Sequence, residues 1–434
     1  MPVALDTASS DFGPQFAALL AAKREIAADV DTAAADIIED VRTRGDEALA
    51  DYSLRFDRID ARAAGLRISA AEIDAAVAVC EATAVKALEL AHARVADYHA
   101  RQKPADLRYT DALGVELGWR WRAIEAVGLY VPGGAASYPS SVIMNAVPAK
   151  VAGCRRIAMA VPTPDGALNP LVLAAARIAG VDEIYRVGGA QAIAALAYGT
   201  RSIAPVAKIV GPGNAYVAAA KRRVFGVVGI DMIAGPSEVV ILADSSADPI
   251  FVAADLIAQA EHDGAAQSIL ITDDAALARA VAAEVERQLQ SLPRAEVAGA
   301  SWRDYGAAIV ARSLEAALPL VDRLAPEHLE IMARDAEALS ERIYNAGAIF
   351  LGSNTPEAIG DYVGGSNHVL PTARSARFTS GLGVLDFMKR TSVLKCGARS
   401  IAALGPAAVA LAEAEGLSGH ARSVELRLAN LPAL

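Results

Sequence analysis

The chain has 434 residues, of which 54% are hydrophobic and 21% charged, and its formal net charge is −10. This length exceeds the size at which a single hydrophobic core keeps growing, so we expect two or more domains. The composition is typical of a packed globular protein and argues against disorder, and the negative charge disfavours general affinity for nucleic acid or anionic membranes.

The first hundred or so residues carry apolar side chains at helical spacing, for example over 29–38 and 71–80, and this predicts helices. From residue 123 the pattern changes to short runs that are typical of strands and end in glycine or proline. These runs cover 127–134, 156–162, 183–189 and 208–213. Alanine-rich stretches between them, over 171–179 and 190–197, predict helices. Strand and helix alternating at this spacing indicate βαβ units and a parallel sheet.

A second series of the same kind follows. Runs over 239–243, 268–272, 307–310 and 348–351 predict strands, and residues 251–261 predict a helix. After residue 383 the pattern is helical again, with a last predicted strand over 424–428. We therefore predict an α/β fold of two lobes flanked by helical terminal segments.

The N-terminal residues contain no basic stretch followed by an apolar run, so we expect no secretory signal. The longest uncharged span, 126–149, is interrupted by proline and glycine and therefore predicts no membrane helix. Cys80, Cys154 and Cys396 are too few and too scattered for a disulfide framework or a cysteine zinc site. We therefore expect a soluble, cytoplasmic protein.

Three glycine turns follow predicted strands and could present backbone N–H groups to a phosphate. They are PGG at 132–134, GGA at 188–190 and GPGN at 211–214. The usual dinucleotide fingerprint, Gly-x-Gly-x-x-Gly, is absent from the chain. The residues alone fit ordinary tight turns of an α/β fold at least as well as a nucleotide site.

Four of the six histidines lie beside polar side chains that can bind a metal, from residue 262 onward: His262, His328, His368 and His420. Imidazole binds zinc as a neutral ligand and also moves protons near neutral pH. Gln259 and His262 are three residues apart on a segment with helical spacing, so both could reach one ion. Asp361 precedes a loop and offers a carboxylate. Nitrogen and oxygen donors of this kind suit a zinc site with room for a substrate, although Gln-x-x-His alone also fits an ordinary helix surface.

Glu327 and His328 place an acid and an imidazole side by side. Two proton acceptors can reach one pocket from a loop or from the start of a helix, as proton transfer requires. A plain helix N-terminus behind Pro326 explains the same residues equally well. Together, the clustered histidines and carboxylates favour a metal-assisted proton-transfer enzyme.

Eight motifs identify a family when they are taken in order along the chain. They are GLYVPGG (128–134), GGAQAIA (188–194), GPGN (211–214), AGPSE (234–238), QAEH (259–262), PEHL (326–329), NHVLP (367–371) and EGLSGH (415–420). With these motifs the chain resembles the histidinol dehydrogenase family over nearly its whole length.

The resemblance implies an enzyme of histidine biosynthesis that oxidises L-histidinol through L-histidinal to L-histidine with two NAD⁺. It also implies one zinc ion in each site. The expected zinc ligands are Gln259, His262, Asp361 and His420. His328 is expected to take the alcohol proton, and Glu327 to activate water for attack on the aldehyde.

The resemblance implies further contacts with the substrate and the cofactor. The expected substrate contacts are Ser237, Gln259, His262, His328, Asp361, His368, Glu415 and His420. Contacts with NAD⁺ are expected at Tyr130, Gln191 and Asn214, each beside one of the glycine turns.

The fold implied by the resemblance consists of two incomplete Rossmann-like α/β/α domains with smaller helical N-terminal and C-terminal segments, in an intertwined homodimer. The expected division is an N-terminal helical arm (1–22), a discontinuous α/β domain with most zinc and catalytic residues (23–125 and 238–380), an NAD-binding domain (126–237) and a segment exchanged in the dimer (381–434). Glu415 and His420 would enter the partner's site on that last segment.

Two other functions remain compatible with the residues. One is a related zinc- and NAD-dependent dehydrogenase that acts on another small polyol, such as a sulfonated diol. Glu415 favours an amino alcohol, because a carboxylate can pair with its ammonium group. The other is a binding protein for zinc or a nucleotide without catalysis, which would have no need for the adjacent proton acceptors Glu327 and His328.

Overall fold

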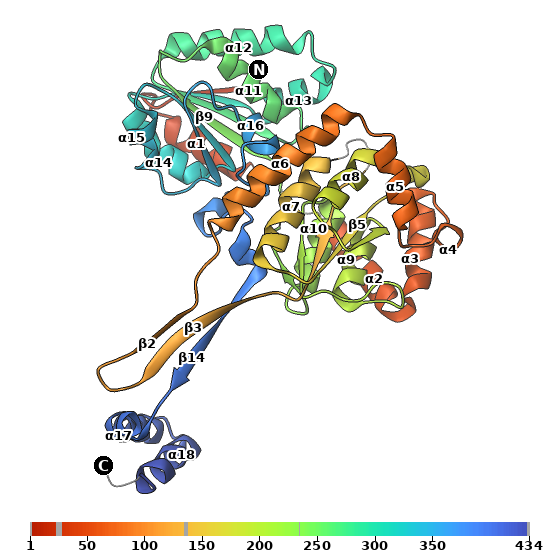
Figure 1. Cartoon of the computed structure of the whole chain (residues 1–434). Coiled ribbons are helices and arrows are strands. Elements are labelled where there is room, and N and C mark those ends of the chain that lie inside the picture. Colours follow the sequence, from red (N-terminus) through yellow and green to blue (C-terminus); the bar gives the residue numbers. More distant parts are fainter. Residues whose placement is uncertain (1, 23–27, 134–137, 234, 432–434) are drawn as a thin grey trace.

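The structure is a computed structural model that describes residues 2–22, 28–133, 138–233 and 235–431. Gly134 and Ala234, which belong to two of the motifs, lie outside the described residues. Two α/β lobes lie side by side, and a long arm projects from them (Figure 1). No helix within the described ranges is both long and apolar enough to cross a membrane.

The first lobe contains a five-stranded parallel sheet. Its strands, in spatial order, are β6 (Glu183–Arg186), β5 (Arg156–Val161), β4 (Ala126–Tyr130), β7 (Lys208–Val210) and β8 (Gly229–Ile230). Numbered along the chain from β4, this order is 3-2-1-4-5, the order of a Rossmann fold without its sixth strand. The direction of winding reverses between β4 and β7, which places a crevice at the carboxyl ends of these two strands.

Helices cover both faces of this sheet. The helices are α7 (Pro139–Ala152), α8 (Pro170–Ile178), α9 (Gly189–Tyr198) and α10 (Ala215–Val224). Along β5, Ile157 and Met159 pack with α7 and α8, whereas Ala158 and Ala160 pack with α9 and α10. Successive side chains of a strand point to opposite faces, so a strand that is covered on both faces is apolar throughout.

The N-terminal helices pack on this same lobe. They are α2 (Ala28–Arg44), α3 (Asp46–Tyr52), η1 (Ser53–Asp57, a π-helix), α4 (Ala61–Ala64), α5 (Ala70–Ala78) and α6 (Ala82–Ala100). Helix α2 contacts α9 and α10, while α5 and α6 contact α8. The expected division grouped 23–125 with 238–380. In the structure, the described helices of the first segment have their apolar faces covered by helices of the five-stranded lobe.

The second lobe contains a six-stranded parallel sheet. Its strands, in spatial order, are β1 (Val3–Asp6), β11 (Ala307–Val310), β10 (Gln267–Thr272), β9 (Glu238–Ala243), β12 (His328–Met332) and β13 (Ala348–Leu351). One face is covered by α11 (Pro249–Ala260), α12 (Ala275–Leu289) and α13 (Ala295–Tyr305), and the other by α1 (Phe12–Ala21), α14 (Leu314–Leu324) and α15 (Ala336–Ser340). The short helix α16 (Glu357–Tyr362) follows β13 and packs on α11. The predicted α/β class with parallel sheets is confirmed.

The arm is an antiparallel sheet with two helices at its end. Its strands are β2 (Leu107–Thr110), β3 (Glu116–Ala123) and β14 (Met388–Lys395), in the order β14-β3-β2. Helices α17 (Ala398–Ala414) and α18 (Ser418–Ala429) pack on each other at its far end (Figure 1). The predicted strand over 424–428 is wrong, since these residues belong to α18. Three short 3₁₀ helices complete the described elements: η2 (Pro164–Gly166), η3 (Ser375–Arg377) and η4 (Val384–Phe387).

Candidate functional site

The predicted catalytic pair lies at the amino end of β12 in the six-stranded sheet, beside β9. Glu327 directly precedes β12, and His328 is the first residue of that strand, in register with Val239 of β9. Both side chains are buried, with 5% and 4% of their surface exposed. Ser237, a predicted substrate contact, directly precedes β9 and therefore lies at the same edge.

The imidazole of His328 is held by backbone and by carboxylates. Its Nδ1 lies 3.2 Å from the carbonyl oxygen of Glu238, and its Nε2 lies 3.5 Å from Oδ1 of Asp361. Burial alone would lower the pKa of this imidazole, but the surrounding carboxylates of Glu357, Glu327 and Asp361 outweigh burial and raise it. When Nδ1 donates its proton to the carbonyl, Nε2 remains as the basic nitrogen on the side of Asp361.

Glu327 is a buried carboxyl with a pKa close to neutrality. Burial raises its pKa to about 7, against the opposing effect of the His328 imidazole 3.9 Å away. Its Oε2 accepts a hydrogen bond of 3.0 Å from the backbone N–H of Glu238. A carboxyl of this pKa exchanges protons readily at physiological pH, as a general base must. The pair therefore offers two proton acceptors in one buried place.

Three of the four predicted zinc ligands lie near one another beside this pair. Gln259 lies in the last turn of α11 and His262 just beyond it, while Asp361 lies on α16, which packs on α11. Donor atoms of His262, Asp361 and Glu357 lie within 4.8 Å of one another. Burial lowers the pKa of His262, which favours the neutral imidazole that a metal ion binds.

The amide of Gln259 supplies an independent indication of a ligand. The side chain is fully buried, yet neither its oxygen nor its nitrogen has a hydrogen-bond partner among the described residues. Buried polar groups are nearly always satisfied, so an amide left without partners points to an absent binding partner. This orphaned amide, together with the nearby imidazole and carboxylates, fits a zinc ion.

Two buried carboxyl groups and a half-buried one, none of them identified in the sequence analysis, lie behind these residues. Asp255 is one helical turn before Gln259 on α11, Glu330 is two residues after His328 on β12, and Glu357 is one turn before Asp361 on α16. These spacings put each carboxyl on the same face of its element as a predicted site residue, and this was the available signal.

The carboxyl groups connect the elements that carry the site. Oε1 of Glu330 accepts a hydrogen bond of 2.7 Å from the backbone N–H of Glu357, which ties β12 to α16. Oε2 of Glu357 in turn lies 3.8 Å from Nδ1 of His328. Burial raises the pKa of Asp255, Glu330 and Glu357, and the charges of its two neighbours raise that of Glu330 further.

His368 lies on the loop after α16 and joins the two lobes. Its Nδ1 is 2.9 Å from the carbonyl oxygen of Asp361, and its Nε2 is 3.4 Å from Oγ of Ser141 on α7. Burial lowers the pKa of His368, so a neutral ring that donates from Nδ1 fits these contacts. This predicted substrate contact therefore lies in the cluster, at the boundary between the lobes.

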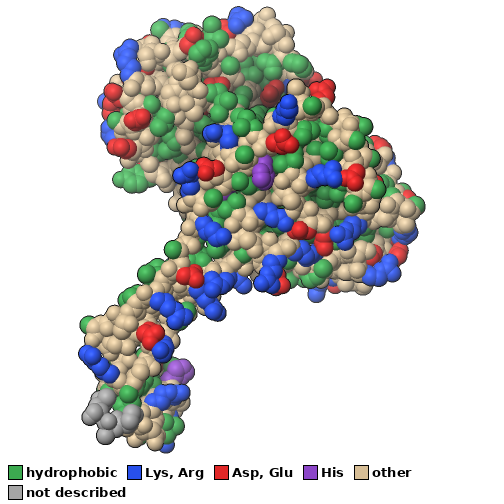
Figure 2. All heavy atoms as spheres, in the orientation of Figure 1, with side chains coloured by type: hydrophobic (Ala, Val, Ile, Leu, Met, Phe, Trp, Pro, Cys, Tyr) green, Lys and Arg blue, Asp and Glu red, His purple; other side chains and the backbone are tan. Residues whose placement is uncertain are grey.

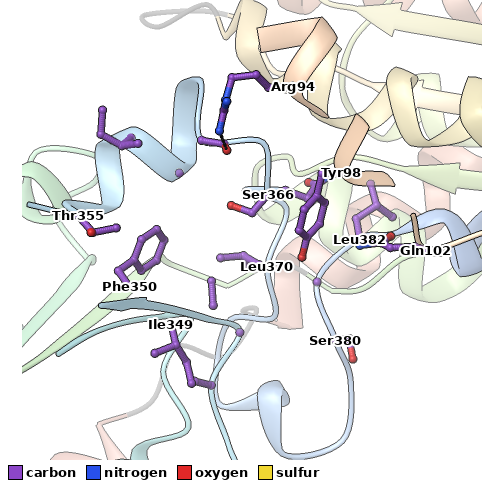
Figure 3. Close-up of a pocket in the computed structure, with 18 residues that line it drawn as sticks. Arg94, Tyr98, Gln102, Ile349, Phe350, Thr355, Ser366, Leu370, Ser380 and Leu382 are labelled. Atoms are coloured by element: carbon purple, nitrogen blue, oxygen red, sulfur yellow. Dashed lines mark hydrogen bonds between the residues drawn. The ribbon is translucent and has the colours of Figure 1, made fainter. Parts of the chain in front are cut away.

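An open pocket of about 620 Å³ adjoins the cluster (Figure 3). Its lining includes Tyr98 of α6 and Gln102 just after that helix on one side, and Ile349 and Phe350 of β13 on the other, so it lies between the lobes. The ring centroid of Phe350 is 6.0 Å from that of His328. The pocket therefore offers space for a small substrate next to the predicted catalytic pair.

Among the predicted zinc ligands and substrate contacts, Glu415 and His420 lie outside the cluster. Glu415 directly follows α17, and His420 lies in the first turn of α18, at the far end of the arm (Figure 1). Both side chains are exposed, and the surface of the arm projects well away from the lobes (Figure 2). Within one chain, the described cluster therefore lacks the fourth predicted zinc ligand.

The predicted NAD⁺ contacts lie at the carboxyl edge of the five-stranded sheet. Tyr130 ends β4, and its hydroxyl accepts a hydrogen bond of 3.1 Å from the N–H of Gly189 at the start of α9. Gln191 is buried on the same helix, and its Oε1 has no partner in the part of the chain that the structure describes. The side chain of Asn214 caps α10 by accepting hydrogen bonds from two N–H groups of its first turn. Tyr130 and Asn214 thus also stabilise the glycine turns.

A buried ion pair fixes the third glycine turn. Lys221 and Asp231 pair with only 2% and 1% of their side chains exposed. Nζ of Lys221 donates to the carbonyl oxygen of Gly211 at 3.0 Å, and Oδ2 of Asp231 accepts from the N–H of Gly211 at 2.8 Å. Gly211 has a φ of +107°, and a Cβ there would collide with the carbonyl oxygen of Tyr130. Only glycine fits this turn, which lies at the crevice between β4 and β7.

Comparison with known proteins agrees with the resemblance found in the sequence. The family profile described as histidinol dehydrogenase matches residues 20–428. The chain is 66% identical over 428 residues to the histidinol dehydrogenases of Bradyrhizobium diazoefficiens and Rhodopseudomonas palustris, with 99% of this chain and 99% of each relative covered. A crystal structure of histidinol dehydrogenase from Elizabethkingia anophelis matches with a TM-score of 0.95 at 36% identity, and the match covers 100% of this chain and 99% of that one. The chain belongs to the histidinol dehydrogenase family.

Proposed function

We propose that this chain oxidises L-histidinol through L-histidinal to L-histidine, with two NAD⁺ and one zinc ion per site. The observation that carries the proposal is the buried pair of proton acceptors, Glu327 and His328, beside the unsatisfied amide of Gln259. A family member that only bound a ligand would not need two proton acceptors of this kind next to a metal site. Membership of the histidinol dehydrogenase family supports the choice of substrate.

The proposed zinc ligands are Gln259, His262 and Asp361 of one chain, with His420 of a second chain as the fourth. Bound zinc would hold the imidazole and amine of the substrate and so place its alcohol carbon. Ser237 and His368 lie around the same place and are proposed to contact the substrate. A pocket between the lobes gives a small amino alcohol room to approach.

In the first oxidation, Nε2 of His328 is the proposed acceptor of the alcohol proton. The O–H bond breaks as Nε2–H forms, the carbon–oxygen double bond forms, and the hydride leaves the carbon for the nicotinamide of NAD⁺. The carbonyl of Glu238 at Nδ1 keeps the ring in the tautomer with a basic Nε2. The buried carboxylates around the ring stabilise the resulting imidazolium.

In the second oxidation, Glu327 is the proposed base for water. Its carboxylate takes a proton from water as the oxygen attacks the aldehyde carbon, and the hydrated intermediate then gives a second hydride to NAD⁺. The pKa of about 7 suits this task, because an appreciable fraction of the carboxyl is ionised at neutral pH and the base is still strong enough to accept a proton.

NAD⁺ is proposed to bind at the glycine turns of the five-stranded sheet, where Tyr130, Gln191 and Asn214 lie. The crevice expected from the strand order lies at this edge, and the N-terminus of α9 carries the positive end of its helix dipole there, which supports binding of a pyrophosphate.

A homodimer is proposed because the arm takes Glu415 and His420 away from the cluster of their own chain. The helices of the arm also leave large apolar side chains exposed, with Leu411 at 65% and Leu426 at 45%. Exposed apolar side chains that are gathered on one element are typical of a surface that another chain covers. A partner would then receive the arm and complete its own set of ligands.

The test follows NADH absorbance with the purified protein, L-histidinol and excess NAD⁺, before chelation, after chelation and after zinc is restored. We expect two NADH per histidinol, loss on chelation and recovery with zinc. No NADH from zinc-loaded dimer with histidinol would contradict the proposal, and a panel of other small alcohols, sulfonated diols included, would then be tried.

A further inference from the structure

Strand β5, the second strand of the five-stranded sheet in chain order, is not followed by the acidic residue that this topology leads one to expect. In dinucleotide-binding sheets of this strand order, a carboxylate at the end of the second strand accepts hydrogen bonds from the adenosine ribose. Here that strand is β5, and the chain continues from Val161 into Pro162 and Thr163 without an acid. The next acid along the chain, Asp165, is exposed and paired with Arg58. The expected carboxylate is therefore absent from this segment of the sequence.

A carboxylate from another part of the chain occupies this place. Asp57 is the last residue of the π-helix η1, and its Oδ2 accepts a hydrogen bond of 3.4 Å from the N–H of Thr163. Only 7% of Asp57 is exposed. Single-turn π-helices occur frequently at functional sites. The π-helix η1, more than a hundred residues away in sequence, thus puts an acid at the end of β5.

The contacts of Asp57 leave its carboxylate poorly satisfied. The 3.4 Å bond from Thr163 is long, and Arg58, the cation next to it in sequence, pairs with Asp165 instead. Burial raises the pKa of Asp57, against the lowering effects of the Thr163 N–H and of the Arg58 charge. Oγ1 of Thr163, which is also buried, has no partner among the described residues. Two buried polar groups side by side are therefore incompletely hydrogen-bonded.

Asp57 lies on the same edge as the glycine turns. Burial, together with the charge of Asp57, raises the pKa of the Tyr130 hydroxyl, which accepts a hydrogen bond from the N–H of Gly189. A Cβ on Gly133 would lie 2.7 Å from Pro162, the residue before Thr163, and a Cβ on Gly188 would also collide with Pro162. The ends of β4, β5 and β6 thus converge beside Asp57, and their backbones come close enough to require glycine.

We propose that Asp57 accepts hydrogen bonds from the ribose hydroxyls of the adenosine half of NAD⁺ and thereby selects NAD⁺ over NADP⁺. The inference rests on the proposed use of a nicotinamide dinucleotide. A desolvated carboxylate gains strong hydrogen bonds from a vicinal diol. A phosphate on the 2′-oxygen removes one donor and adds about two negative charges, which repel Asp57. No described cation besides Arg58 acts on this carboxylate to offset that repulsion.

The test compares Asp57→Asn with the wild-type protein by calorimetric binding of ADP-ribose and of its 2′-phosphate, which needs no turnover. Asn keeps the size and one acceptor but loses the charge. We expect ADP-ribose to bind about tenfold more weakly and its preference over the 2′-phosphate to fall at least about tenfold. Zinc content and the KM for histidinol are expected to stay as in the wild type. Asp36→Asn, which removes an exposed acid of α2 on the same lobe and leaves the Arg58–Asp165 pair intact, is the control and should change neither affinity.

The outcomes separate this inference from the proposed function. If Asp57→Asn retains the wild-type melting temperature and the wild-type preference for ADP-ribose, the inference is overturned and the function stands. If the wild-type protein binds neither ADP-ribose nor NAD⁺, the proposed function fails together with the inference. Asp57→Ala, with no acceptor at all, should weaken ADP-ribose binding beyond Asp57→Asn, and equal binding by the two variants would count against a hydrogen bond to the ribose.

Discussion

Nδ1 of His328 lies 3.2 Å from the carbonyl oxygen of Glu238, the first residue of the neighbouring strand β9. The carbonyl can only accept, so Nδ1 carries the proton in the neutral ring and Nε2 is the basic atom. Nε2 has no hydrogen-bond partner among the described residues, and Oδ1 of Asp361 lies 3.5 Å from it. The backbone of the neighbouring strand therefore determines that the imidazole accepts a proton at Nε2 and not at Nδ1.

Replacing His328 with Asn removes this acceptor and leaves the proposed zinc ligands in place. We expect the alcohol oxidation to fall by about 10²–10⁴-fold, the usual contribution of a positioned base. Zinc content, measured by atomic emission, is expected to stay at one per site. Alcohol oxidation at more than half of the wild-type rate would show that another group takes the proton.

Replacing Glu327 with Gln should separate the two oxidations. The alcohol step needs only His328, so we expect it to change by less than about tenfold, whereas aldehyde oxidation loses its base and falls by about 10²–10⁴-fold. Rates with histidinol and with histidinal, each measured in a single turnover, test this. Equal losses in both steps would contradict the assignment of Glu327 to water.

The same carboxyl predicts a pH dependence. Its pKa is raised to about 7, and a base works only when deprotonated, so the rate of aldehyde oxidation should rise with pH up to about 7 and then level off. Below the pKa the rate should fall about tenfold per pH unit. The residual rate of Glu327→Gln should lack this inflection, and a profile that is identical in the two proteins would assign the inflection to another group.

Replacing His262 with Asn should remove zinc and activity together. The imidazole is one of the donor groups within 4.8 Å of one another, and loss of one ligand typically weakens a zinc site by orders of magnitude. Zinc content and NADH formation are measured on the same preparation. Asp263→Asn, which changes the exposed neighbour of His262, is the control and should retain both. Full activity of the His262 variant without metal would rule out the zinc site.

The two lobes could be predicted from the sequence because their strands are buried on both faces. Val239 to Ala243, for example, forms one continuous apolar run in β9, which pattern alone predicts as a parallel strand. The arm could not be predicted in this way. β14 is largely exposed and carries five polar residues among its eight, so no apolar run marks it. The segment 424–428 alternates like a strand, yet its leucines lie on α18, where packing against α17 decides the structure.

The candidate site was predictable where its residues are neighbours in sequence. Glu327 with His328, and Gln259 with His262, stand together in the chain, and the family resemblance gave them roles. Glu330 and Glu357 share a face with His328 and Asp361, but a glutamate is ordinarily exposed, and the burial of these two on β12 and α16 follows from tertiary packing. Asp57 was missed for the same reason, since its place at β5 depends on a contact across the chain.

Replacing Glu330 with Gln should stabilise the protein at alkaline pH. Burial and neighbouring charges raise the pKa of Glu330 above its unfolded value of about 4.3, so the folded state binds a proton that the unfolded chain has lost. Stability from this group therefore falls as pH rises above the unfolded pKa, and Gln, which cannot ionise, avoids that loss. Its Oε1 can still accept from the N–H of Glu357. We expect the melting temperature of zinc-loaded Glu330→Gln to match the wild type near pH 4.5 and to exceed it by roughly 2 °C at pH 8. A difference that does not change with pH would refute the raised pKa.

The position of His420 at the end of the arm predicts that two different inactive variants restore activity to each other. In a homodimer with exchanged arms, His420→Ala damages the site of the partner, and His328→Asn damages the site of its own chain. A mixed dimer then has one site with both histidines intact. Co-expression with two tags and random pairing should give about a quarter of the wild-type activity. Pairing His262→Asn with His328→Asn is the control, because both changes lie in the cluster and no intact site can form. If the arm served its own chain, the mixed dimer of His420→Ala and His328→Asn would be as inactive as its parents.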